Sequence, residues 1–302
     1  MFIALSFVGK LPAYIIECLH QIRIYFNEEI YLIIDDTNSE YINKIKEYNV
    51  EIIEYKDVYS DEFIKNKEIN NSKFSIIDCL TGREELFIRS LERFFLVSNL
   101  MKKKKLNDCF FMELDNLIYD NPKNWLNEFS KYELCYMFDH FNRCSSGIMY
   151  IKNENSLDGF LQYNLNYING NNYHLNEMQS LFQYYELNKE TVHILPTFWP
   201  TDQFYFMTSM NYDKYNDTIF DALAIGCYLL GLDSYHTNGI IELGKKAPWC
   251  HIDYTNELFE WKIDEKGKRK PYIFNKNNNQ WLLINNLHVH SKDLKSGLSI
   301  PL

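Results

Sequence analysis

Two carboxylates stand two residues apart at the end of an apolar run in the middle of the chain. The run Cys109–Met112 is followed by Glu113 and Asp115. Because alternate residues of a strand point to the same face, both carboxylates project together where the strand ends. Carboxylate oxygens are the ligands that Mg²⁺ and Mn²⁺ prefer in proteins. The spacing therefore predicts a divalent-cation site with Asp115 and Glu113 as ligands.

A second group of metal-binding residue types lies near the end of the sequence. In an extended chain, His288, His290 and Lys292 share one face, and apolar residues occupy the other. A neutral imidazole can complete the coordination of a Mn²⁺-type ion, and a lysine ammonium can hold a diphosphate as a point charge. The alternative is an amphipathic edge strand whose polar residues face the solvent.

These groups need a rigid scaffold, and the pattern of the first half of the chain predicts one. Apolar runs that read as buried strands alternate with stretches of helical spacing. The apolar runs lie at 2–8, 30–34 and 50–54, and the helical stretches at 14–25 and 39–48. Near-continuous apolar strands separated by helices predict an α/β fold with a mostly parallel sheet.

The carboxyl ends of parallel strands meet at one edge of the sheet, where ligands bind in open α/β folds. Gly9 and Asp36 follow the first two predicted strands, so we expect them at the same edge as Glu113 and Asp115. The Asp35-Asp36 pair either contacts a base or ribose, or forms a solvated turn whose acids cap a helix.

A long helix is predicted from about residue 83 to 104, directly before the acidic strand. Arg89 and Arg93 stand four residues apart on it, so they share a face. Arg93 either reaches a bound diphosphate or pairs with an acid. The lysine run 102–105 falls at the carboxyl end of this helix, where the macrodipole favours cations, so we do not interpret it as a nucleic-acid patch.

Composition excludes several classes of protein. The chain has 302 residues, 46% hydrophobic and 24% charged, which indicates a folded globular protein. Its formal charge of −10 argues against affinity for nucleic acid or an anionic membrane surface. We expect no signal peptide and no transmembrane segment. The seven cysteines form no C-x-x-C pair, which fits a reducing cytoplasm, either bacterial or of a virus-infected host cell.

Two motifs that follow one another along the chain resemble segments of glycosyltransferases of the GT-A fold. Residues 112–119 resemble the D-x-D segment, with Glu113 at the first acid, and Ser145-Ser146-Gly147 resembles the N-[AS]-G segment that follows it. The similarity is greatest to uncharacterised bacterial and viral sugar transferases, and more distant to glycogenin-like galactosyl- and glucosyltransferases. It implies Mn²⁺- or Mg²⁺-dependent transfer of a hexose from a nucleotide diphosphate sugar, a UDP-sugar, to a hydroxyl acceptor on a glycan, lipid or protein.

The resemblance also implies roles for individual residues. Glu177, placed in the first turn of a helix by the N-cap Asn176, would face the anomeric carbon, although the helix dipole lowers the pKa of such a carboxylate. It would act as a base in an inverting reaction or as an electrostatic stabiliser in a retaining one. Asp221, in a helix expected over 217–226, either faces the acceptor or caps that helix.

The tail resembles the metal-binding His and phosphate-binding Lys of the glycogenin-like enzymes, without their K-P-W continuation. On this basis His290 is the first choice of metal ligand and His288 the second, and Lys292 precedes Lys295 as the phosphate-binding residue. The residues expected to bind the nucleotide sugar are Ser6, Lys10, Asp36, Arg93, Glu113 and Lys292.

The resulting prediction is a single catalytic domain over residues 1–302. Its Rossmann-like, mixed and mostly parallel sheet is flanked by helices within a nucleotide-sugar-binding core, 1–200. Residues 201–302 form an acceptor-side extension with a β-meander over 259–284 and the metal-binding tail. Two alternatives remain: a carbohydrate- or nucleotide-binding protein whose catalytic site has decayed, and a sugar-phosphate nucleotidyltransferase. The latter needs a Gly-rich basic loop after the first strand, of which Gly9-Lys10 is a poor version.

Overall fold

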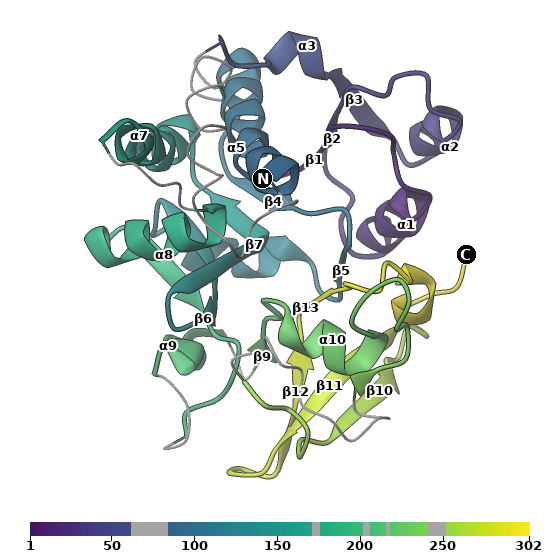
Figure 1. Cartoon of the computed structure of the whole chain (residues 1–302). Helices are drawn as coiled ribbons and strands as arrows, with labels where there is room; N and C mark the ends of the chain where they lie inside the picture. Colours follow the sequence, from purple (N-terminus) through teal and green to yellow (C-terminus); the bar gives the residue numbers. More distant parts are fainter. Residues whose placement is uncertain (62–83, 171–175, 202–205, 216–217, 241–251) are drawn as a thin grey trace.

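The computed structural model describes residues 1–61, 84–170, 176–201, 206–215, 218–240 and 252–302 (Figure 1). Its centre is a seven-stranded sheet in the order β3-β2-β1-β4-β7-β6-β8. The strands are β1 (Phe2–Phe7), β2 (Ile30–Ile34), β3 (Val50–Glu54), β4 (Cys109–Met112), β6 (Leu134–His140), β7 (Arg143–Ile151) and β8 (Val192–Leu195). Only β7 runs antiparallel to its neighbours in this sheet. The predicted α/β fold with a mostly parallel sheet is confirmed.

Each strand of this sheet packs on both faces, which explains the unbroken apolar runs. Ile3 and Phe110 belong to one buried cluster, whereas their neighbours Ala4 and Phe111 belong to another. On the first face lie α1 (Ile15–Tyr25) and α2 (Ile42–Glu47); on the second lie α5 (Glu84–Lys104), α7 (Glu154–Gly170) and α8 (Glu177–Leu187) (Figure 1). The long helix predicted before the acidic strand is therefore α5. None of the described helices is both long and apolar enough to cross a bilayer.

The last third of the chain builds a second sheet below the first in Figure 1. Its order is β10-β11-β12-β9, formed by β9 (Thr218–Ile219), β10 (Phe259–Ile263), β11 (Arg269–Asn275) and β12 (Gln280–Ile284). The predicted meander is confirmed. The helix predicted over 217–226 is wrong at its start, because β9 pairs with β12 and α10 runs over Ala224–Leu230; Asp217 lies outside the described residues. The inner side of this sheet shares one buried cluster with α1.

A two-stranded sheet joins the middle of the chain to its tail. β5 (Asn116–Ile118) pairs antiparallel with β13 (Asn286–His288), and His288 stands opposite Asn116. The extended tail ends at His288 and is followed by a turn, in which the Lys292 N–H donates to the Val289 carbonyl at 3.1 Å and Lys292 has a left-handed φ of 62°. Strand alternation therefore stops before His290. The remaining short elements are α3 (Tyr55–Val58), η2 (Pro122–Trp125), α6 (Leu126–Phe129), α9 (Phe206–Ser209), η3 (Tyr212–Tyr215) and η4 (Leu294–Gly297).

Candidate metal centre and adjoining cavity

The predicted convergence of strand ends is present. β1 pairs in parallel with both β2 and β4, so the residues after each strand, Gly9, Asp35-Asp36 and Glu113, lie at the same edge of the sheet. The acids after β4 occupy a tight turn: the Glu113 N–H donates to the Gly147 carbonyl at 2.9 Å, and the Asn116 N–H donates to the Glu113 carbonyl at 3.1 Å. This turn places Asp115 directly before β5, whose partner strand carries His288.

Glu113, Asp115 and His288 form a compact cluster at this edge. One potential ligand atom from each residue lies within 4.8 Å of the other two. His288 Nε2 lies 3.1 Å from Glu113 Oε2 and 3.6 Å from Asp115 Oδ2. Asp115 and His288 are buried. Two carboxylates and one imidazole are a donor set that suits Mn²⁺, and the carboxylates suit Mg²⁺.

The orientation of the imidazole favours metal binding through Nε2. His288 Nδ1 lies 3.1 Å from the Ala222 carbonyl oxygen, which only accepts hydrogen bonds, so Nδ1 carries a proton. A histidine that ligates a metal through one nitrogen commonly donates the other N–H to such a group. Burial alone lowers the pKa of His288, but the charges of Asp115 and Glu113 outweigh it and hold the pKa well above its usual value.

Two further cations surround the carboxylates. The Lys292 ammonium contacts Asp115, and the Arg93 guanidinium contacts Glu113 and donates to Ser146 Oγ at 2.9 Å. Burial raises the pKa of Asp115, but His288 and Lys292 hold it well below its usual value. Burial alone would also raise the pKa of Glu113, but Arg93 and His288 lower it to about 2. Both carboxylates are thus ionised and attract positive charge.

His290 has a different position from the one expected. Its ring centroid lies 4.6 Å from that of His288, but it is not part of the cluster with the two acids. Burial and the charge of His288 lower the pKa of His290 to about 3, so its imidazole is neutral. The structure therefore brings His288, the second choice, together with Glu113 and Asp115, whereas His290 lies outside this cluster. Lys295 lies 3.7 Å from Glu17 and is largely exposed, so Lys292 is the lysine at the centre.

Glu177 lies near the acidic cluster, in the first turn of α8, and the predicted N-cap of this helix is present. The Asn176 side chain caps the helix by accepting the Gln179 N–H at 2.9 Å. Glu177 Oε1 lies 3.9 Å from Arg93 Nη2, which connects it to Glu113 through the guanidinium. Burial raises the pKa of Glu177 to about 7, with Glu113 adding to the rise and Arg93 opposing it. The expected effect of the helix dipole is thus outweighed by burial.

The Asp221 carboxylate accepts hydrogen bonds from backbone N–H groups. Oδ1 accepts the N–H groups of Leu223 and Ile225, each at 2.9 Å, and Oδ2 accepts those of Gly226 at 2.7 Å and His288 at 2.9 Å. The side chain is buried. These bonds correspond to the capping alternative, and the carboxylate also binds the strand that carries His288.

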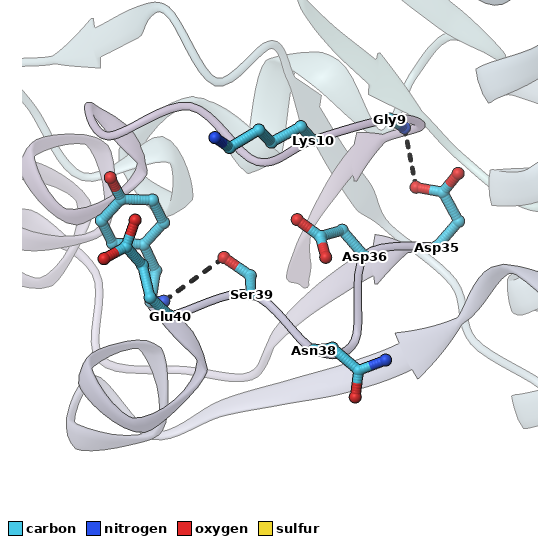
Figure 2. Close-up of a pocket in the computed structure, with 8 residues that line it drawn as sticks. Gly9, Lys10, Asp35, Asp36, Asn38, Ser39 and Glu40 are labelled. Atoms are coloured by element: carbon cyan, nitrogen blue, oxygen red, sulfur yellow. Dashed lines mark hydrogen bonds between the residues drawn. The ribbon is translucent and has the colours of Figure 1, made fainter.

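A cavity of about 490 Å³ adjoins the ends of β1 and β2 (Figure 2). It is lined by Gly9, Lys10, Asp35, Asp36, Asn38, Ser39, Glu40 and Tyr41. Asp35 Oδ1 accepts the Gly9 N–H at 2.7 Å, and Asp36 Oδ2 accepts the Leu11 N–H at 3.3 Å. Carboxylates outnumber the Lys10 ammonium in the lining, so the cavity suits a neutral ligand rich in hydrogen-bond donors better than a phosphate.

One loop links the cavity to the metal centre. It follows β1 and leads into α1, whose N-cap is Tyr14. Burial, then the charges of Asp115 and Glu113, raise the pKa of Tyr14, so this residue lies in the field of the acids. Ser6, near the end of β1, has a buried hydroxyl without a hydrogen-bond partner among the described residues. Buried polar atoms are normally paired, and such exceptions suit a ligand site.

Sequence reasoning missed the residues that make room for His288. A Cβ on Gly147 would lie 2.9 Å from His288 Nδ1, and one on Gly226 would lie 2.0 Å from the His288 carbonyl oxygen. The sequence singled out Gly147 only as part of the segment that resembles N-[AS]-G, and not as a residue beside a histidine. Asn116 and Asn286, which bond to one another at 3.1 Å, carried no recognisable signal.

Comparison with other proteins gives only a structural likeness. No family model and no curated protein matches the sequence. The structure is similar to the apo form of mouse xyloside xylosyltransferase 1 (13% identity, TM-score 0.45), covering 65% of this chain and 84% of that one. It is also similar to the PaToxG glycosyltransferase (12%, 0.40, covering 62% and 69%) and to a cytidylyltransferase from Leptospira borgpetersenii serovar Hardjo-bovis (9%, 0.38, covering 67% and 75%). Glycosyltransferases are thus among the structures similar to this chain.

Proposed function

We propose that the protein is a metal-dependent glycosyltransferase. It transfers a hexose from a nucleotide diphosphate sugar, a UDP-sugar, to a hydroxyl group of a glycan, lipid or protein. The observation that carries the proposal is the cluster of Glu113, Asp115 and His288, with Lys292 beside it, at the sheet edge that also holds the cavity. A divalent cation bound there would neutralise the charge that forms on a departing diphosphate.

The charges of the two neighbouring sites suit different parts of the nucleotide sugar. The cavity presents Asp35 and Asp36 as acceptors, so it is suited to the ribose hydroxyls and the base N–H of a nucleoside. Its volume is in the range of small-ligand sites. The diphosphate would then lie toward the metal centre, where Lys292, which contacts Asp115, could supply a positive charge to a phosphate oxygen.

Glu177 is proposed to face the reacting carbon of the sugar. Its Oε2 atom is buried and has no hydrogen-bond partner in the described part of the chain. With a pKa of about 7, the carboxyl group can exchange a proton at neutral pH. In an inverting reaction its carboxylate would accept the proton of the acceptor hydroxyl; in a retaining reaction it would stabilise positive charge at the sugar.

The test is donor hydrolysis and transfer across a panel of nucleotide sugars, with Mn²⁺ and after chelation. We expect Mn²⁺-dependent release of nucleoside diphosphate from one donor, and loss of that release in Asp115→Asn. Asp293→Asn is a matched control in the tail, because this half-buried acid accepts a hydrogen bond from Ser296 Oγ and lies outside the cluster. Unchanged metal-stimulated turnover in Asp115→Asn would remove Asp115 from the mechanism.

The same assay separates the alternatives. Metal-dependent binding of UDP without hydrolysis or transfer would indicate a decayed site. Release of pyrophosphate from a nucleoside triphosphate and a sugar phosphate would instead indicate a nucleotidyltransferase.

A further inference from the structure

We propose that Asp221 is a positioning residue for the metal ligand His288. It acts with Asn286 and Asn116 as a buried polar network that holds the tail against the acidic turn. This inference rests on the proposed metal site and assigns Asp221 to binding of the cation, not to contact with an acceptor.

The first step is the fixation of the His288 backbone by Asp221. Asp221 Oδ2 accepts the His288 N–H at 2.9 Å and the Gly226 N–H at 2.7 Å, while Oδ1 accepts two further N–H groups at the start of α10. One carboxylate therefore joins α10 to β13. The adjacent Ala222 carbonyl accepts from His288 Nδ1, so the same turn sets the direction of the imidazole ring.

The second step extends this connection to the acidic turn. Asn286 Oδ1 accepts the Asp221 N–H at 3.0 Å, and Asn286 Nδ2 donates to the Asp221 carbonyl at 2.9 Å and to Asn116 Oδ1 at 3.1 Å. Asn116 directly follows Asp115 and stands opposite His288 in the two-stranded sheet. The network thus spans 170 positions of sequence and ties the two ligand-bearing segments together.

The third step is the lack of space for another arrangement. Gly226 and Gly147 approach His288 so closely that a Cβ at either position would lie 2.0 Å or 2.9 Å from an atom of His288. Asp221, Asn116 and Asn286 are themselves buried. Interiors packed in this way resist displacement, and a ligand set has to be held to within about 0.5 Å to bind well.

The experiment measures Mn²⁺ binding by calorimetry, with no substrate, in the full chain. Asn286→Ala removes three bonds of the network, and Asp221→Asn removes two of the four bonds that the carboxylate accepts. Asn285→Ala is the matched control: Asn285 is equally buried, but its amide donates to Thr218 Oγ1 in β9, away from the ligands. Loss of an outer partner of a metal ligand typically weakens metal binding about 10- to 100-fold. Thermal unfolding of each variant reports on folding.

We expect both Asn286→Ala and Asp221→Asn to bind Mn²⁺ at least about tenfold more weakly than Asn285→Ala, even where Asn285→Ala and Asn286→Ala lose similar stability. Should Asp221→Asn not fold, the comparison of Asn286→Ala with Asn285→Ala tests the inference. Equal Mn²⁺ affinity in the two asparagine variants, in a wild-type protein that binds Mn²⁺, would overturn this inference and leave the metal site standing. A wild-type protein that binds no Mn²⁺ would overturn both.

Discussion

The metal centre and the cavity share one edge of the central sheet but are built in different ways. The cavity is lined by two loops, 9–10 and 35–41, that follow neighbouring parallel strands. The metal centre combines a turn after β4 with the end of β13, near the carboxyl end of the chain. The cavity therefore follows from strand order alone, whereas the metal centre depends on a distant segment being held in place.

The two sites also differ in how their charges are balanced. In the metal centre, His288, Lys292 and Arg93 surround Asp115 and Glu113, so cations already occupy the field of the acids. In the cavity, Asp35 and Asp36 accept backbone N–H groups, and Figure 2 shows the Asp35 carboxylate pointing to Gly9. Under the proposed function, the centre that holds cations against acids would bind a metal and a diphosphate, and the cavity would bind a neutral nucleoside.

The largest expected effect separates the two sites completely. His288→Ala removes the imidazole from the cluster, so we expect Mn²⁺ affinity to fall by about 100-fold or more, while binding of uridine is unchanged. Asp36→Ala should weaken the binding of uridine and leave Mn²⁺ affinity unchanged, since Asp36 lines the cavity and lies outside the cluster. Calorimetry with Mn²⁺ alone and with uridine alone measures both. If either variant weakened both ligands equally, the division between the sites would be wrong.

The next effect concerns pH and depends on burial beside the metal centre. The pKa of Glu177 rises from 4.5 to about 7 on folding, so the folded protein binds an extra proton between these values. The contribution of Glu177 to the free energy of unfolding should therefore fall as pH rises from about 4.5 to 7, by an amount on the order of 3 kcal/mol. Folding also shifts the pKa values of Asp221 and His288, so the quantity compared is the stability of the wild-type protein minus that of Glu177→Gln, which lacks the Glu177 contribution. Denaturant unfolding between pH 5 and about 8 measures it.

Asp36→Asn is the control for that pH experiment, because Asp36 belongs to the cavity. We expect it to keep the pH dependence of the wild-type protein. A Glu177→Gln variant whose stability declined as steeply as that of the wild-type protein across this range would show that Glu177 does not contribute to the decline.

A smaller effect tests whether the Lys292 ammonium occupies the place beside Asp115 that a divalent cation would take. Lys292 contacts Asp115, so a divalent cation has to displace it. In Lys292→Met we expect Mn²⁺ to bind several-fold more tightly without nucleotide, because the competing charge is gone. UDP should bind about tenfold more weakly in the presence of Mn²⁺, since a charge-assisted bond to phosphate is lost, while uridine binds as before. A variant with weaker Mn²⁺ binding would contradict this exchange. Lys295→Met is the matched control, as Lys295 lies away from the cluster.

The smallest expected effect refines the cavity. Asp36→Asn keeps the size of the side chain but replaces an acceptor with a donor, so we expect uridine to bind about two- to tenfold more weakly. Mn²⁺ affinity should not change. An unaltered affinity for uridine would show that Asp36 serves only to cap the loop through Leu11.

The difference between the two regions also explains what the sequence could predict. Apolar runs predicted the strands, and the helices between them predicted that the strands are parallel, so Asp36 and Glu113 were correctly expected at one edge. The position of Glu177 in the first turn of α8 was correctly predicted from the Asn176 cap, and its role stays a prediction. These features depend on local spacing, which a sequence displays directly.

The tail could be predicted only in part, because its outcome depends on tertiary contacts. Alternation placed His288 and His290 on one face, but the chain leaves the strand after His288, and nothing in the residue types indicates that end. In the sequence, Asp221 likewise looks like an ordinary helix-capping residue. Its hydrogen bond with the His288 N–H could be predicted only with the fold known.

The most direct test of the account is pulsed electron paramagnetic resonance of the Mn²⁺-loaded protein. If one cation is held jointly by Glu113, Asp115 and His288, the spectrum will show coupling to a single imidazole nitrogen. That coupling should change when histidine is labelled with ¹⁵N, and it should persist in His290→Phe. Bound Mn²⁺ with no nitrogen coupling, or a coupling that disappears in His290→Phe, would contradict the metal centre described for this chain.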